Sequence, residues 1–326
     1  MIEPKLVDNL FAPDIKQAPI RQGFGEGMLV LGQENPEVIA LCCDLVESTK
    51  LGDFMRAFPD RYVEVGVAEQ NLAGLGAGMA HEGKIPFITS YATFSPGRNW
   101  DQIRVAICYS GNNVKIIGSH AGISVGPDGA THQAMEDIAT LRVLPRMTVL
   151  VPCDSNEARR ATIAAGRMKG PVYIRLAREK TPLFTTDDTP FEIGQAYVYR
   201  AGQDVTIAAA GPQVYYALQA ANELASEGIE CEVINVASVK PLDEATLVKS
   251  VQKTGCLVSA EEHQITGGVG SAIAEALSRN FPVPQEFVGM PDHFGESGEP
   301  NELIAKWGMD GKGIKSAVKK VLQRKK

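Results

Sequence analysis

The sequence contains no pair of cysteines at the spacing typical of a metal site. Its 6 cysteines are scattered, Cys42 and Cys43 are adjacent, and no C-x-x-C motif occurs. Zinc sites and disulfide frameworks of the usual kinds are therefore not expected. We expect buried free thiols in a cytoplasmic protein, because the cytosol keeps thiols reduced.

The sequence also lacks a long hydrophobic run. Its longest uncharged stretch, residues 205–222, is divided by a Gly-Pro pair into a strand and the start of a helix, which argues against a membrane span. The amino-terminal stretch MIEPKLVDNLFAPDIK contains acids and prolines, whereas a signal peptide needs a basic start and an apolar run. We therefore expect neither a membrane partner nor a secretory leader.

Basic residues are outnumbered by acidic ones, with 32 Lys and Arg against 39 Asp and Glu. The net charge is −7, and the C-terminal stretch KSAVKKVLQRKK, which we interpret as a solvated helix end, is the one basic cluster. Nucleic acid is therefore not expected as the main partner. The 326 residues, 44% hydrophobic and 22% charged, are typical of a globular protein and suit two domains.

Short runs rich in β-branched residues alternate with amphipathic helical stretches along the chain. This alternation predicts an α/β fold of two doubly wound domains, in which mainly parallel sheets carry helices on both faces. The expected strands are 37–44, 85–92, 113–122, 147–153, 171–177, 204–211, 229–237 and 255–263. The expected helices are 66–81, 98–109, 134–142, 155–168, 212–226, 243–252 and 268–280.

A break in the pattern divides the chain. Residues 179–194, EKTPLFTTDDTPFEIG, are rich in Thr, Asp and Pro and show no periodicity, which is typical of a linker. We therefore expect an extended arm at 1–14, a first domain at 15–180, a linker at 181–194 and a second domain at 195–326.

The richest polar cluster follows an expected strand, where function gathers in open α/β sheets. Residues 120–133 contain His120, Asp128, His132 and several glycines, and glycines let a backbone turn tightly and approach a ligand. A zinc site is the alternative, but no cysteine lies nearby and no H-x-x-x-H pattern occurs. The two histidines at a strand end favour a functional loop.

The stretch GVAEQNLAGLGAGMA, residues 66–80, has Glu69 as its one charged side chain. Its small residues predict a helix packed closely against other backbone. Glu69 is either an ordinary acid at a helix start, favoured by the helix dipole, or a buried carboxyl that hydrogen-bonds a ligand. The small neighbours favour burial, and the residues alone leave both interpretations open.

Several motifs together resemble the transketolase family. They are YVEVGVAEQNLAGLGAGMA, YATF, GISVGPDGATHQAMEDIATLRVLPRMTVLVPCDSNE, VKPLDE and EEHQITGGVGSAIAE. More narrowly, the sequence is similar over almost its whole length to the carboxyl-terminal half of a split transketolase, encoded as its own chain. The resemblance implies a thiamine diphosphate enzyme with its pyrimidine-binding domain at 15–180 and a transketolase C-terminal domain at 195–326.

The resemblance assigns cofactor-binding residues. Glu69 matches the catalytic glutamate that hydrogen-bonds the pyrimidine N1′, so that the amine of the cofactor can take a proton from its thiazolium ring. Tyr91 and Phe94 match aromatics that pack on the pyrimidine, although such rings are also common in a core. Asp44 matches an acid close to the cofactor. The third ring of the family lies slightly downstream, where the longer stretch SPGRNW places Arg98.

The resemblance also implies substrate-binding residues. Asp128 matches the residue that binds the sugar hydroxyl next to the reacting carbon, and His132 the one near the carbonyl; with His120 they line the substrate channel. His120 and His132 join Glu69 as catalytic residues. The phosphate of the sugar would be held by Arg21, Ser48, His120 and Arg178, a set in which guanidiniums can make bidentate contacts to a dianion.

Half of the family's active site is missing from the sequence. The signature for the diphosphate and its metal, Gly-Asp-Gly followed by a downstream Asn, does not occur. We therefore expect no metal ligand in this chain and binding of the pyrimidine end of thiamine diphosphate alone. An N-terminal transketolase subunit would supply the diphosphate-binding domain and Mg²⁺, in an α2β2 assembly with its active sites at the interface.

The implied reaction is transfer of a two-carbon ketol group from a ketose phosphate to an aldose phosphate. A subunit like 1-deoxyxylulose-5-phosphate synthase shares VKPLDE and the DG-THQ loop, but that enzyme is normally a longer single chain. An oxo-acid dehydrogenase E1 β-like subunit is a separate chain but lacks this histidine pattern. A non-catalytic scaffold is disfavoured by the intact Glu69, His120, Asp128 and His132. The stretch GGVGSAIAEAL lacks full dinucleotide-binding spacing and indicates helix–sheet packing.

Overall fold

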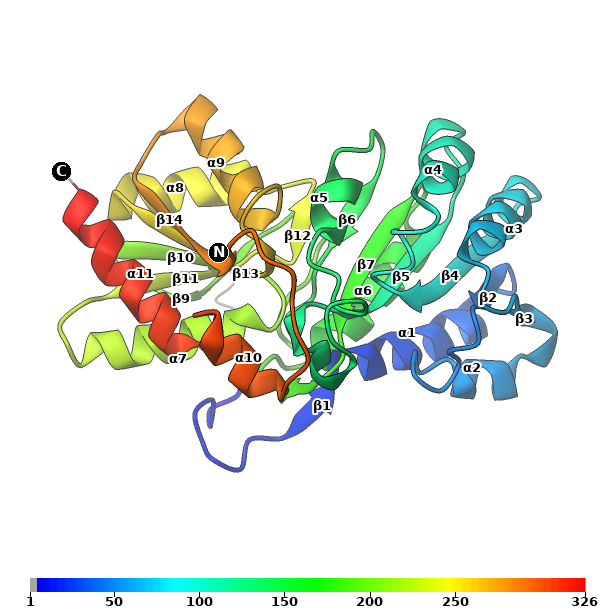
Figure 1. Ribbon diagram of the computed structural model, residues 1–326, viewed down its shortest axis with the longest axis horizontal. Helices are drawn as coiled ribbons and strands as arrows, with labels where there is room; N and C mark the ends of the chain where they lie inside the picture. The colour runs from blue at the N-terminus through cyan, green and yellow to red at the C-terminus, as the bar shows by residue number, and fades with distance from the viewer. Residues whose placement is uncertain (1–4, 326) are drawn as a thin grey trace.

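The structure is a computed structural model that describes residues 5–325. Two open sheets lie side by side, and helices cover both faces of each (Figure 1). Most neighbouring strands are parallel, but each sheet also has one antiparallel strand at an edge: β12 (Ser238–Lys240) pairs with β6 (Thr148–Leu150), and β9 (Tyr197–Arg200) pairs with β11 (Cys231–Asn235). The predicted α/β class with two mainly parallel sheets is confirmed.

Each sheet contains strands that are buried on both sides. The seven-stranded sheet has the order β12-β6-β7-β5-β4-β2-β3, and its strands are β2 (Val38–Cys42), β3 (Tyr62–Glu64), β4 (Ile85–Tyr91), β5 (Lys115–Ala121), β6 (Thr148–Leu150), β7 (Val172–Ala177) and β12 (Ser238–Lys240). The five-stranded sheet has the order β14-β13-β10-β11-β9, and its strands are β9 (Tyr197–Arg200), β10 (Val205–Ala209), β11 (Cys231–Asn235), β13 (Leu257–Gln264) and β14 (Gln285–Met290). Fully buried parallel strands explain the continuous apolar runs of the sequence.

The helices divide between the faces of the two sheets. The larger sheet is covered on one face by α1 (Ile20–Glu34), α2 (Gly52–Ala57) and α6 (Ser155–Arg167), and on the other by α3 (Glu69–His81), the π-helix η2 (Ile103–Tyr109) and α5 (Asp137–Arg142). The smaller sheet lies between α7 (Gln213–Ala225) with α11 (Gly311–Arg324) and α8 (Glu244–Thr254) with α9 (Val269–Asn280). The short helices are η1 (Pro59–Arg61), α4 (Trp100–Gln102), η3 (Ile123–Asp128) and α10 (Pro300–Lys306).

Helix α1 is not predicted from the sequence, because its 15 residues include four glycines, which weaken an isolated helix. Its packing against α6 explains why it forms. A Cβ built at Gly23 would lie 1.8 Å from the carbonyl oxygen of Ser155, and one at Gly27 would lie 2.8 Å from Cβ of Thr162. The glycines therefore let two helix backbones approach closely, and tertiary contact overrides the low propensity.

The two sheets share one continuous core. Side chains from α5 and β6 pack in the same cluster as side chains from β11, α8 and α9. Strand β12 comes from the second half of the chain, yet it pairs with β6 in the larger sheet. The two halves therefore meet along a sheet edge as well as through apolar side chains.

The segment expected as a linker is held against the fold. The carboxylate of Asp154 accepts hydrogen bonds from the N–H groups of Phe184 (3.0 Å) and Thr185 (2.8 Å), and β8 (Lys180–Pro182) pairs with β1 (Gln17–Pro19). Residues 1–4 of the expected arm lie outside the described residues, and Leu6 bridges to Thr185. The domain boundaries themselves stay predictions. Within residues 5–325, no helix is long and apolar enough to cross a bilayer.

Candidate functional site

The carboxyl ends of β2, β4, β5 and β7, which are neighbours in the larger sheet, meet at one edge. Tyr91 ends β4, His120 is the penultimate residue of β5, and Arg178 follows β7 directly. The predicted site residues from three separate segments are thus brought to the edge where ligands bind in open α/β sheets.

Glu69 is the first residue of α3 and is only 3% exposed. One carboxylate oxygen accepts a hydrogen bond from Oγ of Ser90 at 3.1 Å, and the other accepts one from Nη1 of Arg98 at 3.0 Å. Its backbone carbonyl accepts a third from Asn99. The burial that the small neighbours predict is confirmed, and the acid is held rigidly at the start of its helix by side chains from the following strand and loop.

Two aromatic rings form a surface close to Ser90 and Arg98, the partners of this carboxylate. Tyr91 and Phe94 lie nearly parallel, with centroids 6.1 Å apart and an interplanar angle of 19°. Arg98, at the place expected near the third ring, puts its guanidinium carbon 4.0 Å from the centroid of Phe94. The same guanidinium donates a hydrogen bond to Glu69, so Arg98 connects the aromatic surface to the acid. The contact between Arg98 and Glu69 was not predicted from the sequence.

The two histidines of the predicted loop lie against these rings. His120 stacks on Tyr91 with centroids 3.9 Å apart, and His132 meets Phe94 edge-on at 5.2 Å. His120 also adopts a φ of 56°, a left-handed conformation that is uncommon for residues other than glycine and clusters at functional sites.

The charge around His120 is positive. Burial, followed by the nearby Arg21, Arg178 and His132, lowers the pKa of His120 to about 3. The imidazole is therefore neutral at physiological pH, and its Nδ1 shares a hydrogen bond of 2.8 Å with Oγ of Ser119. A neutral ring here can donate or accept a hydrogen bond without adding a further cation.

Arg21 and Arg178 stand close together. Nη1 of Arg21 donates to the carbonyl oxygen of Arg178 at 2.6 Å, and burial, together with the charge of Arg178, lowers the pKa of Arg21. Nε of Arg21 is buried without a hydrogen-bond partner. Two adjacent guanidiniums with an unpaired buried donor suit an anionic ligand.

The loop after β5 is compact. Nη1 of Arg178 donates to the carbonyl oxygen of Val125 at 2.5 Å, and Nδ1 of His132 shares a hydrogen bond of 2.9 Å with Oγ1 of Thr131. Asp128, at the end of η3, is exposed. The loop thus leaves the Asp128 carboxylate open to a ligand while its ends are fixed.

Asp44 and Ser48 are not joined to this cluster by any hydrogen bond, ion pair or ring contact found within residues 5–325. Asp44 has a φ of 59° and an exposed side chain, and its N–H donates to Oε1 of Glu64 at 2.7 Å. Although burial alone would raise the pKa of Glu64, hydrogen bonds from Tyr62, Gly66 and Asp44 hold it below its usual value. Glu64 therefore helps to fix the turn that carries Asp44. This role was not predicted from the sequence, where an acidic residue at the end of β3 is the sign of it.

Comparison with known proteins shows the family of this chain. Residues 16–182 match the pyrimidine-binding domain of transketolase, and residues 194–314 match the transketolase C-terminal domain. The chain belongs to the transketolase family. The family uses thiamine diphosphate, and the strands of the larger sheet other than β12 lie in the segment that matches the pyrimidine-binding domain.

Relatives within the transketolase family include separately encoded subunits. A 6-deoxy-6-sulfo-D-fructose transketolase subunit of Clostridium sp. is 41% identical over 97% of this chain and 98% of its own length. An apulose-4-phosphate transketolase subunit of Phocaeicola vulgatus is 38% identical, over 90% and 94% respectively. The predicted resemblance to the carboxyl-terminal subunit of a split transketolase is confirmed.

Solved transketolase structures agree with this placement. A split-gene transketolase, described as an inactive beta tetramer, shares 46% identity with a TM-score of 0.89, covering 94% of this chain and 99% of that one. Transketolase from Campylobacter jejuni has a TM-score of 0.79 at 22% identity, covering 96% of this chain and 50% of that one, which shows the shared fold.

Proposed function

We propose that this chain is the carboxyl-terminal subunit of a heteromeric transketolase that moves a two-carbon ketol group from a ketose phosphate to an aldose phosphate. The observation that carries the proposal is the buried Glu69 beside the stacked Tyr91 and Phe94, with His120 and His132 on the same surface. The names of the similar subunits, which describe them as transketolase subunits for 6-deoxy-6-sulfo-D-fructose and apulose 4-phosphate, support it.

The residues present fit the pyrimidine end of thiamine diphosphate. A flat heterocycle can stack on Tyr91 and Phe94, and a protonated ring nitrogen can donate to the carboxylate of Glu69. When bound, the cofactor supplies stabilisation of negative charge at carbon, which ketol transfer requires. Arg98, which is 48% exposed, is the partner of Glu69 that can move aside or share the carboxylate.

The substrate would lie along the histidines and the loop. His120, held neutral by burial and by the two arginines, can hydrogen-bond sugar oxygens without repelling the arginines. His132, which is half-buried, would exchange a proton with a hydroxyl formed or lost at the reacting carbons. Asp128 would accept a hydrogen bond from the neighbouring hydroxyl. Each role follows the resemblance, and the ring contacts of His120 and His132, with Asp128 between them in the same loop, support it.

The paired arginines suit the phosphate of the sugar. In the complete enzyme, Arg178→Ala is expected to lower kcat/KM for a phosphorylated acceptor about 10- to 100-fold, the value of one lost charge-assisted hydrogen bond. Transfer to the same acceptor without its phosphate should be nearly unchanged. The control is Arg279→Ala, an exposed arginine on α9 paired with Glu244. Equal losses of kcat/KM with both acceptors would contradict the role of Arg178 in binding phosphate. Ser48 is assigned to the same phosphate.

A partner is required because this chain supplies the pyrimidine side of the site. On α3, a Cβ built at Gly74 or Gly78 would meet nothing within 4 Å, and Leu75 beside them is exposed. The side bearing Gly76 instead packs on β4. The predicted close packing of α3 is thus satisfied on one side, and the other side suits the N-terminal subunit, which would bring the diphosphate site and Mg²⁺ in an α2β2 assembly. Within residues 5–325, no group of three acidic, His or Cys side chains could hold a metal.

The state of the cysteines indicates in which cellular compartment such an enzyme works. All six are free and buried, as the sequence predicts. Burial raises the pKa of Cys43 and of Cys231 to about 12, so these thiols are unreactive at neutral pH. We propose a cytoplasmic location, where free thiols persist.

A donor–acceptor screen tests the proposed reaction. The chain, assembled with its partner, thiamine diphosphate and Mg²⁺, should shorten a ketose phosphate by two carbons and lengthen an aldose phosphate by two. The panel includes 6-deoxy-6-sulfo-D-fructose and apulose 4-phosphate, which the relatives' names indicate as their sugars. Release of carbon dioxide from an oxo acid without ketol transfer would contradict the proposal and favour the synthase-like or dehydrogenase-like reactions.

A further inference from the structure

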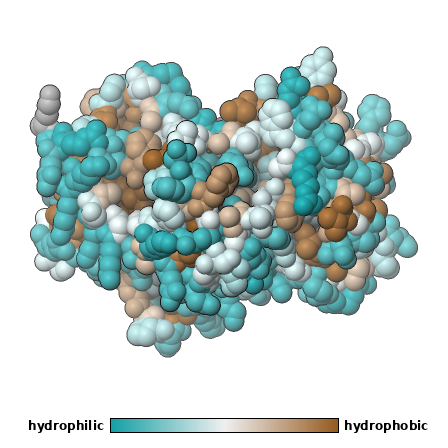
Figure 2. Space-filling model, in the orientation of Figure 1, coloured by the Kyte–Doolittle hydropathy of each residue, from teal (hydrophilic) through white to brown (hydrophobic). Residues whose placement is uncertain are grey.

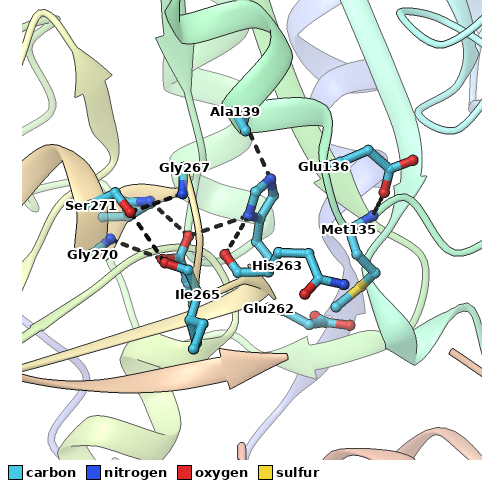
Figure 3. Close-up of polar contacts among 12 residues, drawn as sticks. Met135, Glu136, Ala139, Glu262, His263, Ile265, Gly267, Gly270 and Ser271 are labelled. Atoms are coloured by element: carbon cyan, nitrogen blue, oxygen red, sulfur yellow. Dashed lines mark hydrogen bonds and ion pairs between the residues drawn. The ribbon is translucent and has the colours of Figure 1, made fainter. Parts of the chain in front are cut away.

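Two adjacent buried acids on β13 point to opposite sides. Glu261 accepts hydrogen bonds from the N–H groups of Val269 (2.7 Å) and Gly270 (2.9 Å) at the start of α9. Glu262, 2% exposed, instead accepts one from the N–H of Ser124 at 2.6 Å. Figure 3 shows Glu262 directed away from Gly270 and the start of α9. One carboxylate therefore serves the smaller sheet's own helix, and the other reaches into the loop after β5.

The loop is built to receive this carboxylate. Gly122 has a φ of 91°, and a Cβ there would lie 2.3 Å from Oε1 of Glu262. A side chain at this position would therefore expel the acid from the loop. The N–H of Gly122 donates to the carbonyl oxygen of Ala134 at 2.9 Å, so the two ends of the loop are joined where Glu262 binds.

The backbone of β13 is fixed to the same place. Nη2 of Arg175 donates to the carbonyl oxygens of Glu262 (2.8 Å) and Ala134 (3.0 Å), and its Nε donates to Asp137 at 2.8 Å. The N–H of Gln264 donates to the carbonyl oxygen of Met135 at 2.8 Å. Figure 3 shows Met135 and Glu136 beside the end of β13 that carries His263. The position of Glu262 relative to the loop is therefore set by bonds on both sides of it.

A second segment of the C-terminal part closes over the loop. Nε2 of Gln133 donates to the carbonyl oxygens of Glu296 (2.8 Å) and Ile123 (3.2 Å). A Cβ at Gly126 would lie 2.9 Å from Pro300, and one at Gly129 would lie 2.6 Å from Oγ of Ser297. One side of the loop between His120 and Gln133 is thus packed against residues of the C-terminal part, while Asp128 stays exposed.

We propose that Glu262 is a positioning residue for ketol transfer: through the Ser124 N–H it holds the loop that presents Asp128 and His132 to the sugar. The inference rests on the proposed function of that loop, and it gives the C-terminal domain a role in substrate binding. Glu262 is tied to the loop after β5, whereas Glu261 is tied to the helix that follows their own strand.

The test compares Glu262→Ala and Glu262→Gln with the matched control Glu261→Gln, all in the assembled enzyme. Glu262→Ala should raise KM for the sugar phosphates about 10-fold, as expected for a lost hydrogen bond to a charged group. It should change kcat less and leave thiamine diphosphate affinity unchanged. Glu262→Gln should remain near wild type, because its amide oxygen can accept the same N–H. The control should leave KM unchanged.

Amide hydrogen exchange of the isolated chain gives a readout that needs no substrate. Glu262→Ala should speed exchange in residues 122–133, whereas Glu261→Gln should speed it at the start of α9 and leave the loop unchanged. If the assembled enzyme showed no ketol transfer, the proposed function would fail, and loop exchange would still report on Glu262. Unchanged loop exchange or unchanged KM in Glu262→Ala would overturn the inference, as would equal impairment by Glu262→Gln.

Glu262→Asp covers the case in which the alanine variant does not fold. The shorter side chain keeps its charge but draws the acceptor back from Ser124. Faster loop exchange and a raised KM are expected in the same direction as for alanine. A wild-type loop and a wild-type KM in this variant would overturn the positioning role.

Discussion

The purified chain is expected to show no ketol transfer alone and to gain it when its N-terminal partner is added. The reason is chemical, because the family signature for the cofactor's diphosphate and metal does not occur in the sequence. A related split-gene chain, 46% identical, is described as inactive in a tetramer of its own kind. The measurement is the transfer rate of the chain, the partner and their mixture, each with thiamine diphosphate and Mg²⁺.

The side of α3 that does not pack on β4 is the surface where the partner is expected to bind, and a substitution there tests this. Gly78→Arg should leave the fold and melting temperature of the chain unchanged, because a Cβ there meets nothing within 4 Å. It should weaken partner binding at least about 10-fold, the usual cost of a bulky group in a packed contact. Gln323→Arg, exposed near the end of α11 at the far side of the molecule (Figure 1), is the control. Activity of the chain alone, or tight binding by Gly78→Arg, would refute the assignment.

The second large effect is expected from Glu69→Ala. Removing the carboxylate removes the hydrogen-bond acceptor for the pyrimidine nitrogen, so turnover in the assembled enzyme should fall about 1,000-fold or more, within the range for a lost proton-transfer group. The fold should be kept, because Arg98 is 48% exposed and water can solvate it once its partner is gone. The measurement is kcat at saturating and at limiting cofactor, with circular dichroism as the check on folding.

Glu82→Ala is the matched control for this prediction. Glu82 follows the other end of the same helix and is exposed, so its loss should leave turnover unchanged. Glu69→Gln separates charge from shape, because it retains an acceptor oxygen but cannot hold a proton. Full turnover by Glu69→Ala at limiting cofactor would show that the acid has no part in activating the cofactor.

The mixed character of the molecular surface helps to explain why the open side of α3 is hard to predict from sequence alone. Figure 2 shows hydrophilic and hydrophobic residues interspersed over the visible face of the molecule. The exposed apolar residues near α3 and η2 include Val67, Leu75, Val105 and Tyr109. In the sequence these positions are indistinguishable from core positions, and only the packing of α3 on β4 reveals which side remains open.

The features that sequence predicts well depend on local pattern. The alternation of strand-like and helix-like stretches predicts the two sheets, and the small residues around Glu69 predict its burial. Features that depend on contacts between distant segments escape prediction. The glycines of α1 are explained by the close packing of this helix on α6. The role of Arg98 depends on its hydrogen bond to Glu69, 29 positions away. Glu262 lies 138 positions from Ser124, and nothing near it in the sequence marks it as a partner of the loop.

Strand β12 determines where a protein of this kind can be divided. A cut between residues 180 and 195 would leave one fragment with the edge of β6 unpaired and the other with a strand detached from its sheet. Each fragment would also expose its part of the shared apolar core, and unpaired edges and apolar surfaces favour aggregation. The two sheets are therefore expected to melt in a single cooperative transition.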